Sequence, residues 1–395
     1  MIYLDHNATT PVRPEVLDAA LPWLREGYGN PSSVYSLGQK ARAAIERARE
    51  QVAGLIGAED ASEIVFTSGG SESDVLAVAG AAWQAHDESG GRRRGIVSTS
   101  IEHDAVRALL AQLRRRGFAV AEAPCGRDGV TSAPALIELI SDATAVVSVM
   151  HANNETGALQ PAAAAAAAAR AAGALVHTDA VQSLGKTEID VKALGVDLLA
   201  LSGHKLNAPK GVGALYVRRG VRLSPVVTGH QEKNRRGGTE NVGGIVGLGA
   251  ACALAARELS RSSAHALALR RRIEAGVLSI GGARLNGPAE LRLPNTAHFS
   301  FPGLDGHHLV VGLDLEGVCV SSGPACSSGA SAPSHVLTAM GVPPELAGGS
   351  IRVSVGWGTT EADVEAFLAI LPRAVARLRA SEDIDEGSHA ARSAA

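Results

Sequence analysis

Acidic, amide and basic side chains stand just after two short apolar runs in the middle of the chain. Runs with the length and residue types of β-strands occupy 174–176, 198–201 and 212–217. Asp179 and Gln182 follow the first run. Ser202, His204 and Lys205 follow the second. Because parallel strands of an α/β sheet present their functional groups at one edge, we expect these five side chains to meet in one crevice.

A lysine and an aspartate in one crevice suit the chemistry of pyridoxal phosphate. A desolvated lysine amine is reactive and could form a Schiff base with an aldehyde cofactor. A carboxylate on the neighbouring strand could bind the protonated ring nitrogen of that cofactor. The residues alone leave a second interpretation open, in which Lys205 is a surface lysine in a loop and Asp179 caps a helix.

Length and charge place the chain among large globular proteins. With 395 residues it can build a large domain and a smaller one. A formal net charge of −3 gives no electrostatic reason to bind nucleic acid or an anionic membrane. The N-terminus lacks the basic region and apolar core of a signal peptide, and no uninterrupted apolar run approaches the roughly 18 residues of a spanning helix. We expect a soluble, cytoplasmic protein.

Four cysteines are too few and too scattered for a disulfide framework, and they lack the paired C-x-x-C spacing of a zinc site. We therefore expect reduced thiols and no metal. Cys252 in an alanine-rich segment and Cys319 in the strand-like VCV fit small buried hydrophobic residues, and Cys125 fits a loop residue without a role. Cys326 differs, because the glycine, serine and proline around it predict a loop with an accessible thiol.

Seven motifs occur in the order found in cysteine desulfurases of the NifS and IscS type, and the likeness runs from Tyr3 to about Leu371. They read YLDHNATTPV, FTSGGSESDVLA, VMHANNETG, HTDAVQSLGK, SGHKLNAPKGVGALYV, RRGGTENV and SSGPAC. The sequence therefore resembles this family, in which class-V aminotransferase-like enzymes use pyridoxal 5'-phosphate. Any one of the motifs alone would be a weak signal.

The resemblance implies an α/β fold, that of fold-type-I pyridoxal phosphate transferases, with a mainly parallel sheet in the large domain and a smaller α+β domain. We expect the large cofactor-binding domain over 15–255. The small domain should combine 1–14 with 256–379 and carry the cysteine loop. The polar stretch 380–395 reads as a disordered tail.

The resemblance also assigns cofactor contacts. The glycine turn before the helix at 70–83 could hold an anion at the helix N-terminus, although Gly-Ser turns also cap helices that bind nothing. The family places the cofactor phosphate there. The residues carried over for cofactor binding are Gly70, Ser71, His103, Asn154, Asp179, Gln182, Ser202, His204, Lys205 and Thr239. Among these, His103 stands at the end of a strand that we expect from residue 95 to Glu102 and His103. It would stack on the pyridine ring and move protons.

Three further assignments come from the resemblance. Arg352, with Asn154, would bind the substrate, the guanidinium gripping the carboxylate through a two-pronged hydrogen bond. Thr239 would reach the phosphate of the partner subunit in a homodimer. Cys326 would accept the sulfur. The residues alone also fit a solvent-facing arginine on a strand and a basic surface loop around Thr239.

The function implied is a cysteine desulfurase that converts L-cysteine to L-alanine with Lys205, His103 and Cys326 as catalytic residues. Sulfur would pass from a persulfide on Cys326 to an acceptor, such as an iron–sulfur cluster assembly scaffold or a tRNA-thiolation protein, without direct contact to nucleic acid. Alternatives are a selenocysteine lyase, another fold-type-I lyase or aminotransferase, and a catalytically silent sulfur-assembly scaffold. The intact catalytic residues argue against the last.

Overall fold

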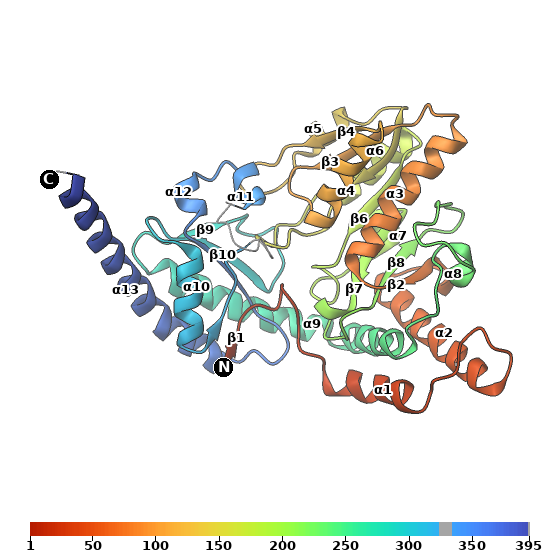
Figure 1. The fold of residues 1–395 in the computed structure, drawn as a ribbon, viewed down its shortest axis with the longest axis horizontal. Helices are drawn as coiled ribbons and strands as arrows, with labels where there is room; N and C mark the ends of the chain where they lie inside the picture. Colours follow the sequence, from red (N-terminus) through yellow and green to blue (C-terminus); the bar gives the residue numbers. More distant parts are fainter. Residues whose placement is uncertain (324–333, 394–395) are drawn as a thin grey trace.

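The computed structural model describes residues 1–323 and 334–393, with side chains through residue 380. A seven-stranded sheet forms its larger half (Figure 1). In spatial order the strands are β2 (Ile64–Thr67), β8 (Gly213–Val217), β7 (Leu198–Ser202), β6 (Leu175–Asp179), β5 (Thr144–Ser148), β3 (Gly95–Thr99) and β4 (Ala119–Ala123). β8 runs antiparallel to both neighbours, and the pairs from β7 to β4 are parallel. The expected mainly parallel sheet is confirmed.

Both faces of this sheet are covered by helices, which explains why its central strands read as continuous apolar runs. α3 (Gly70–Glu88) and α4 (Asp104–Arg115) pack on one face, against Val146 and Leu198. α2 (Ser36–Ile56), α6 (Ala162–Ala171) and α9 (Val242–Leu278) pack on the other, against Val147 and Leu199. Consecutive residues of one strand therefore face opposite cores, as the two-residue period of a strand requires.

A smaller half contains a second sheet and its own core. Its strands are β12 (Ser350–Ser354), β10 (Thr296–Ser300) and β9 (Arg284–Asn286), all antiparallel, with β1 (Ile2–Tyr3) pairing separately and in parallel with β11 (Val318–Cys319). α10 (Gly306–Leu315) and α13 (Glu361–Ser393) cover this half. Phe299, Phe301 and Phe367 are among the fully buried residues of its core.

α9 joins the two halves as one continuous helix (Figure 1). Leu248 and Cys252 belong to the core of the large half, whereas Ile273 and Val277 belong to the core of the small half. The expected boundary at residue 255 therefore falls inside α9. Within the described residues this helix alone is long and apolar enough to cross a membrane, but half of its most apolar window is buried in the protein. It is the shared core helix of both halves.

The remaining helices are short. They are α1 (Pro14–Arg25), α5 (Ala133–Glu138), α7 (Val191–Leu194), α8 (Gln231–Asn234), α11 (His335–Ala339) and α12 (Pro344–Ala347), with single 3-10 turns at Ala61–Glu63 and Gly203–Lys205. Pro14 stands at the first position of α1, where its missing N–H costs no hydrogen bond. The long alanine run after Pro161 forms α6, because alanine has the highest helix propensity.

Three local expectations differ from the structure. The strand expected up to His103 ends at Thr99, because the chain turns there and His103 caps α4. Cys319 is only partly buried, since β11 pairs at the edge of the small half. The backbone continues as helix to Ser393 where we expected a disordered tail from residue 380. Alanine, glutamate and arginine in this stretch favour helix.

Candidate active site

The parallel pairing of β6 with β7 brings the predicted residues of both strand ends together. Asp179, the last residue of β6, lies opposite Ala200 of β7, and the Gly203–Lys205 turn follows directly. Asp179 is buried and accepts a hydrogen bond of 2.8 Å from the Val181 backbone N–H. Burial raises the pKa of Asp179, while the electrostatic effects of His103 and Lys205 and the hydrogen bond from Val181 act in the opposite direction. A cationic group bound next to this buried carboxyl group would therefore stabilise its charged form.

A second buried carboxyl group lies near Asp179 on the same face of the sheet. His177, two residues earlier on β6, approaches Asp74 of α3 with 3.3 Å between Nε2 and Oδ1. Burial, and then the charge of Asp179, raises the pKa of Asp74 well above its usual value. Burial lowers the pKa of His177 to about 3. The His177 ring is therefore neutral at physiological pH.

Lys205 carries an amine that is unusually easy to deprotonate. Its Nζ donates to the carbonyl oxygens of Ala8, at 2.7 Å, and Asn7. Burial and then the nearby charge of Arg352 lower the pKa of Lys205 to about 8, against the opposing effect of two carboxylates. At neutral pH a useful fraction of this amine is therefore unprotonated and nucleophilic.

The first turn of α3 and the end of β7 form a cradle with free backbone donors. A Cβ atom at Gly70 would lie 2.7 Å from Val181 Cγ2 and 3.5 Å from Ser202 Cβ, so only glycine leaves this space open. The N–H groups of the first turn of a 19-residue helix point into this region, beside Ser71. Ser202 is buried at its edge. The arrangement suits a phosphate group.

Histidine side chains at two ends of the crevice have different partners. His103 accepts the Ala105 N–H through Nδ1, at 3.2 Å, so Nε2 stays available for a proton. His204 lies 3.2 Å from Thr9 Oγ1 through Nδ1. Burial, and then the charge of Lys205, lowers the pKa of His204 to about 4, so the ring is neutral.

Two amide side chains complete the cofactor side. Asn154 Oδ1 is buried and has no hydrogen-bond partner in the part of the chain that the structure describes. A ligand donor would satisfy it. Gln182 donates to the Asn7 carbonyl oxygen at 3.0 Å and accepts from Lys186 at 3.1 Å.

Arg352 lies in the interior, which excludes the interpretation of a solvent-facing arginine. It stands on β12 with 1 % of its surface exposed. Nη2 donates to Asp5 Oδ1 at 2.7 Å, and Nη1 donates to the Asn154 carbonyl oxygen at 3.0 Å. The second contact joins Arg352 of the small half to a predicted site residue of the large half.

Thr239 is not brought into this cluster, and the structure does not describe Cys326. Thr239 is exposed on the loop after α8 and, within residues 1–323 and 334–380, shares no hydrogen bond with another predicted site residue. Cys326 lies outside the described residues. The last described residue before its loop is Gly323, whose carbonyl oxygen lies 3.5 Å from Arg352 Nη1. The loop therefore begins at the site.

Sequence reasoning missed the role of the N-terminal arm, residues 4–10. Its backbone oxygens bind Lys205 and Gln182, its Thr9 meets His204, and its Asp5 pairs with Arg352. The motif YLDHNATTPV marked this stretch only through the family resemblance, because its residue types and spacing suggest no chemistry by themselves. Only the contacts reveal that the arm crosses the site.

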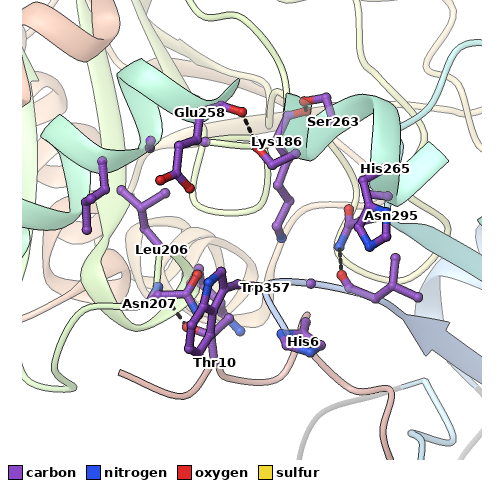
Figure 2. Close-up of a pocket in the computed structure, with 18 of the residues that line it drawn as sticks. His6, Thr10, Lys186, Leu206, Asn207, Glu258, Ser263, His265, Asn295 and Trp357 are labelled. Atoms are coloured by element: carbon purple, nitrogen blue, oxygen red, sulfur yellow. Dashed lines mark hydrogen bonds between the residues drawn. The ribbon is translucent and has the colours of Figure 1, made fainter. Parts of the chain in front are cut away.

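Lys186 was missed as well. Its amine points into a cavity of about 400 Å³ that it lines together with Lys205 and Trp357 (Figure 2). Burial, then the charges of Lys205 and Arg352, lowers the pKa of Lys186 well below its ordinary value. The signal in the sequence was its position four residues after Gln182. The two side chains share a hydrogen bond from Lys186 Nζ to Gln182 Oε1.

Comparisons with known proteins identify the family of the chain. The family model described as aminotransferase class-V matches residues 2–367. "Cysteine desulfurase IscS" of Methanosarcina thermophila is 45 % identical over 379 residues, covering 96 % of this chain and 93 % of that protein. "Cysteine desulfurase NifS" of Azotobacter vinelandii is 43 % identical over 380 residues, covering 96 % and 93 %.

Solved structures show the same fold. A "NIFS-LIKE PROTEIN" matches with a TM-score of 0.88 and 38 % identity over 95 % of this chain and 100 % of that one. "SspA in complex with cysteine" matches with a TM-score of 0.79 and 34 % identity over 90 % and 99 %. The chain belongs to the aminotransferase class-V family of pyridoxal phosphate enzymes, and within it to the cysteine desulfurases of the NifS and IscS type.

Proposed function

We propose that the protein converts L-cysteine to L-alanine and that the residues named above carry the reaction. The observation that carries this proposal is the Lys205 amine, whose pKa is lowered to about 8 and which interacts electrostatically with Asp179 at the end of the neighbouring strand. The resemblance to cysteine desulfurases over nearly the whole chain supports the substrate. The solved relative bound to cysteine supports the same choice.

The residues present fit pyridoxal phosphate. The open cradle at Gly70 suits the phosphate, and buried Asp179 suits a protonated ring nitrogen. Among the described residues Asn154 Oδ1 has no hydrogen-bond partner, and a donor on the cofactor would supply one. Ser71, Ser202, His204 and Gln182 lie around the same edge. When bound, the cofactor withdraws electrons from the substrate and so weakens bonds at its α- and β-carbons.

Proton movements fall to two side chains. Lys205 can hold the cofactor through its amine and, once released by the substrate amine, can accept and return a proton near neutral pH. His103 presents Nε2, because Nδ1 is occupied by the Ala105 N–H. Asp179, buried at the end of β6, would hold the protonated ring nitrogen of the cofactor.

Substrate binding and sulfur transfer complete the reaction. Arg352 binds the carboxylate of cysteine, with Asn154 beside it. The Cys326 thiolate attacks the substrate sulfur, the carbon–sulfur bond breaks, and the three-carbon skeleton leaves as alanine after it gains protons. Gly323, at the start of the cysteine loop, already contacts Arg352. A persulfide on Cys326 then passes its sulfur to an acceptor.

Assembly and cellular context stay predictions. A homodimer in which Thr239 serves the partner's site is supported by the exposure of Thr239 in this chain. Delivery of sulfur to an iron–sulfur scaffold or a tRNA-thiolation protein, and a cytoplasmic location, follow from the resemblance alone. The division into domains at 15–255, with 1–14 and 256–379 as the small domain, also stays a proposal.

Purified protein loaded with pyridoxal phosphate tests the function directly. We expect a visible cofactor absorption band and release of sulfide and alanine in equal amounts when cysteine and a thiol reductant are added. Selenocysteine is compared at matched concentration, and a preference for it would favour a selenocysteine lyase. A fully loaded protein that releases neither sulfide nor alanine from cysteine would contradict the proposed reaction.

A further inference from the structure

The N-terminal arm places a second carboxylate on the arginine assigned to the substrate. Asp5 Oδ1 lies 2.7 Å from Arg352 Nη2, and their side chains are 17 % and 2 % exposed. Water therefore screens this ion pair only weakly. A charge-assisted hydrogen bond of this kind is roughly twice as strong as a neutral one.

The other donors of Arg352 leave one usable edge. Nη1 already donates to the carbonyl oxygens of Asn154, at 3.0 Å, and Gly323, at 3.5 Å. Nε is buried and has no partner among the described residues. A two-pronged pair needs two parallel N–H groups, and the edge that contains Nε also contains Nη2. A ligand carboxylate that uses this edge must therefore share or take Nη2 from Asp5.

Asp5 is fixed in this position by its backbone. The Ser354 N–H donates to the Leu4 carbonyl oxygen at 2.8 Å, and the His6 N–H donates to the Ser354 carbonyl oxygen at 3.2 Å. The Tyr3 hydroxyl donates to the Asp5 carbonyl oxygen at 3.0 Å. These contacts tie the arm to β12, the strand that carries Arg352. A ligand can turn the Asp5 side chain aside, but the carboxylate stays within reach.

We propose that Asp5 is a specificity-determining residue that competes with the substrate carboxylate for Arg352. The proposal rests on the function proposed above, because it takes Arg352 as the carboxylate site. Without substrate, Asp5 supplies a counter-charge to the buried Arg352 guanidinium. In return it lowers the affinity for every ligand with a carboxylate, the product alanine included, and so favours product release.

Two thiol compounds test the competition in the cofactor-loaded protein. 3-Mercaptopropionate has the thiol and the carboxylate of cysteine but no amine, so it cannot react with the cofactor aldehyde, and calorimetry measures its dissociation constant. Asp5→Asn keeps the shape of the side chain and removes its charge. We expect this variant to bind 3-mercaptopropionate about three- to tenfold more tightly than the parent protein. Cysteamine has no carboxylate, so its affinity, measured by cofactor absorbance, should not change.

Control variants separate the possible causes. Glu365→Gln removes one negative charge from an exposed ion pair with Arg272 and should bind both compounds like the parent. If Arg352→Ala binds 3-mercaptopropionate as the parent does, the assigned carboxylate site is wrong and the proposed function loses its substrate contact. If Arg352→Ala loses binding while Asp5→Asn binds no more tightly, the competition alone is refuted.

A supporting role for Asp5 would give a different result. In that case Asp5→Asn would weaken 3-mercaptopropionate binding, because Arg352 would lose its orientation. Asp5→Ser is measured alongside, since it also removes the charge. Loss of folded, cofactor-binding protein in both variants would show that Asp5 mainly stabilises the structure, and this too would overturn the proposal.

Discussion

The cofactor side and the substrate side of the site are assembled in different ways. Asp179 and Lys205 meet because β6 and β7 are neighbouring parallel strands, so the register of one strand pair is enough. Arg352 and Asp5 are 347 positions apart and meet only where the N-terminal arm runs along β12. Changes on the cofactor side should therefore alter chemistry in an intact fold. Changes on the substrate side should appear first as changes in affinity.

Lys205→Ala should have the largest effect, because it removes the amine that we propose holds the cofactor. We expect loss of borohydride-reducible cofactor and of all desulfurase activity, while circular dichroism and thermal stability stay close to the parent. Mass spectrometry after borohydride reduction checks the attachment. Lys186→Met is the matched control, since Lys186 is the second buried amine of the same cavity. Cofactor fixed to Lys186 in the parent protein would contradict the assignment.

The sequence located the residues that meet at the ends of β6 and β7 because the signals for strands and their ends are local. Apolar runs of strand length, each followed by polar residues, locate Asp179, Ser202 and Lys205 at one sheet edge without any knowledge of distant contacts. The same reasoning gives the sheet and the helices that cover it. Local signals place the ends of elements less accurately. The strand expected to reach His103 ends at Thr99, and His103 caps α4.

The substrate side was predictable only through resemblance. An arginine in the middle of a strand gives no sign of whether it is buried, and pairing of Arg352 with Asp5 depends on tertiary contacts across the whole chain. Lys205 donates hydrogen bonds to the backbone oxygens of Asn7 and Ala8. Every residue type has such an oxygen, so the sequence does not indicate which ones accept. Such contacts follow from how the arm is packed and leave no pattern in the sequence.

Cys326→Ser should have the next largest effect and should separate binding from sulfur transfer. In the proposed reaction the Cys326 thiolate takes the sulfur, so this variant should bind pyridoxal phosphate and cysteine yet release almost no sulfide or alanine. Cys319→Ser is the control and should remain active. Mass spectrometry of protein incubated with cysteine should find the persulfide on the peptide with Cys326. A persulfide on Cys319 alone would refute the assignment.

Arg352→Ala should act mainly on affinity and so tests the substrate side. Loss of a charge-assisted pair to the carboxylate should weaken cysteine binding by about 2–3 kcal/mol, which is roughly 30- to 150-fold. The cofactor spectrum should barely change, because Arg352 meets the cofactor side only through the Asn154 carbonyl oxygen. Cysteine titrations monitored by cofactor absorbance measure the effect. Equal affinity in the variant and the parent would show that the carboxylate binds elsewhere.

The pH dependence of cofactor loading should sharpen the account of Lys205. Burial lowers its pKa to about 8, and only the unprotonated amine attacks an aldehyde. The rate of covalent loading of the cofactor-free protein should therefore rise about tenfold per unit of pH below 8 and level off above it. Stopped-flow absorbance follows the rate. A rise that continues to pH 10 would mean that the amine keeps its ordinary pKa.

Thr239→Ala should have the smallest effect, because it removes one neutral hydrogen bond, worth about 1 kcal/mol or roughly fivefold in cofactor affinity. This variant is informative because it shows which subunit's site loses cofactor affinity. Thr239 is exposed in this chain, while its loop is tied to the first turn of α3 by the ion pair between Arg236 and Glu72, with 2.7 Å between Nε and Oε1. A partner subunit that packs there would receive Thr239 beside its own phosphate cradle.

Mixed dimers decide between the two locations. When Lys205→Ala and Thr239→Ala subunits are mixed and re-equilibrated, each heterodimer has one site with both changes and one site with neither, provided that Thr239 crosses the interface. The mixture should then recover part of the cofactor affinity that Thr239→Ala lost. If Thr239 serves the site of its own chain, every site keeps one change and no recovery follows. A monomer with full activity in sedimentation and assay would rule out the crossing altogether.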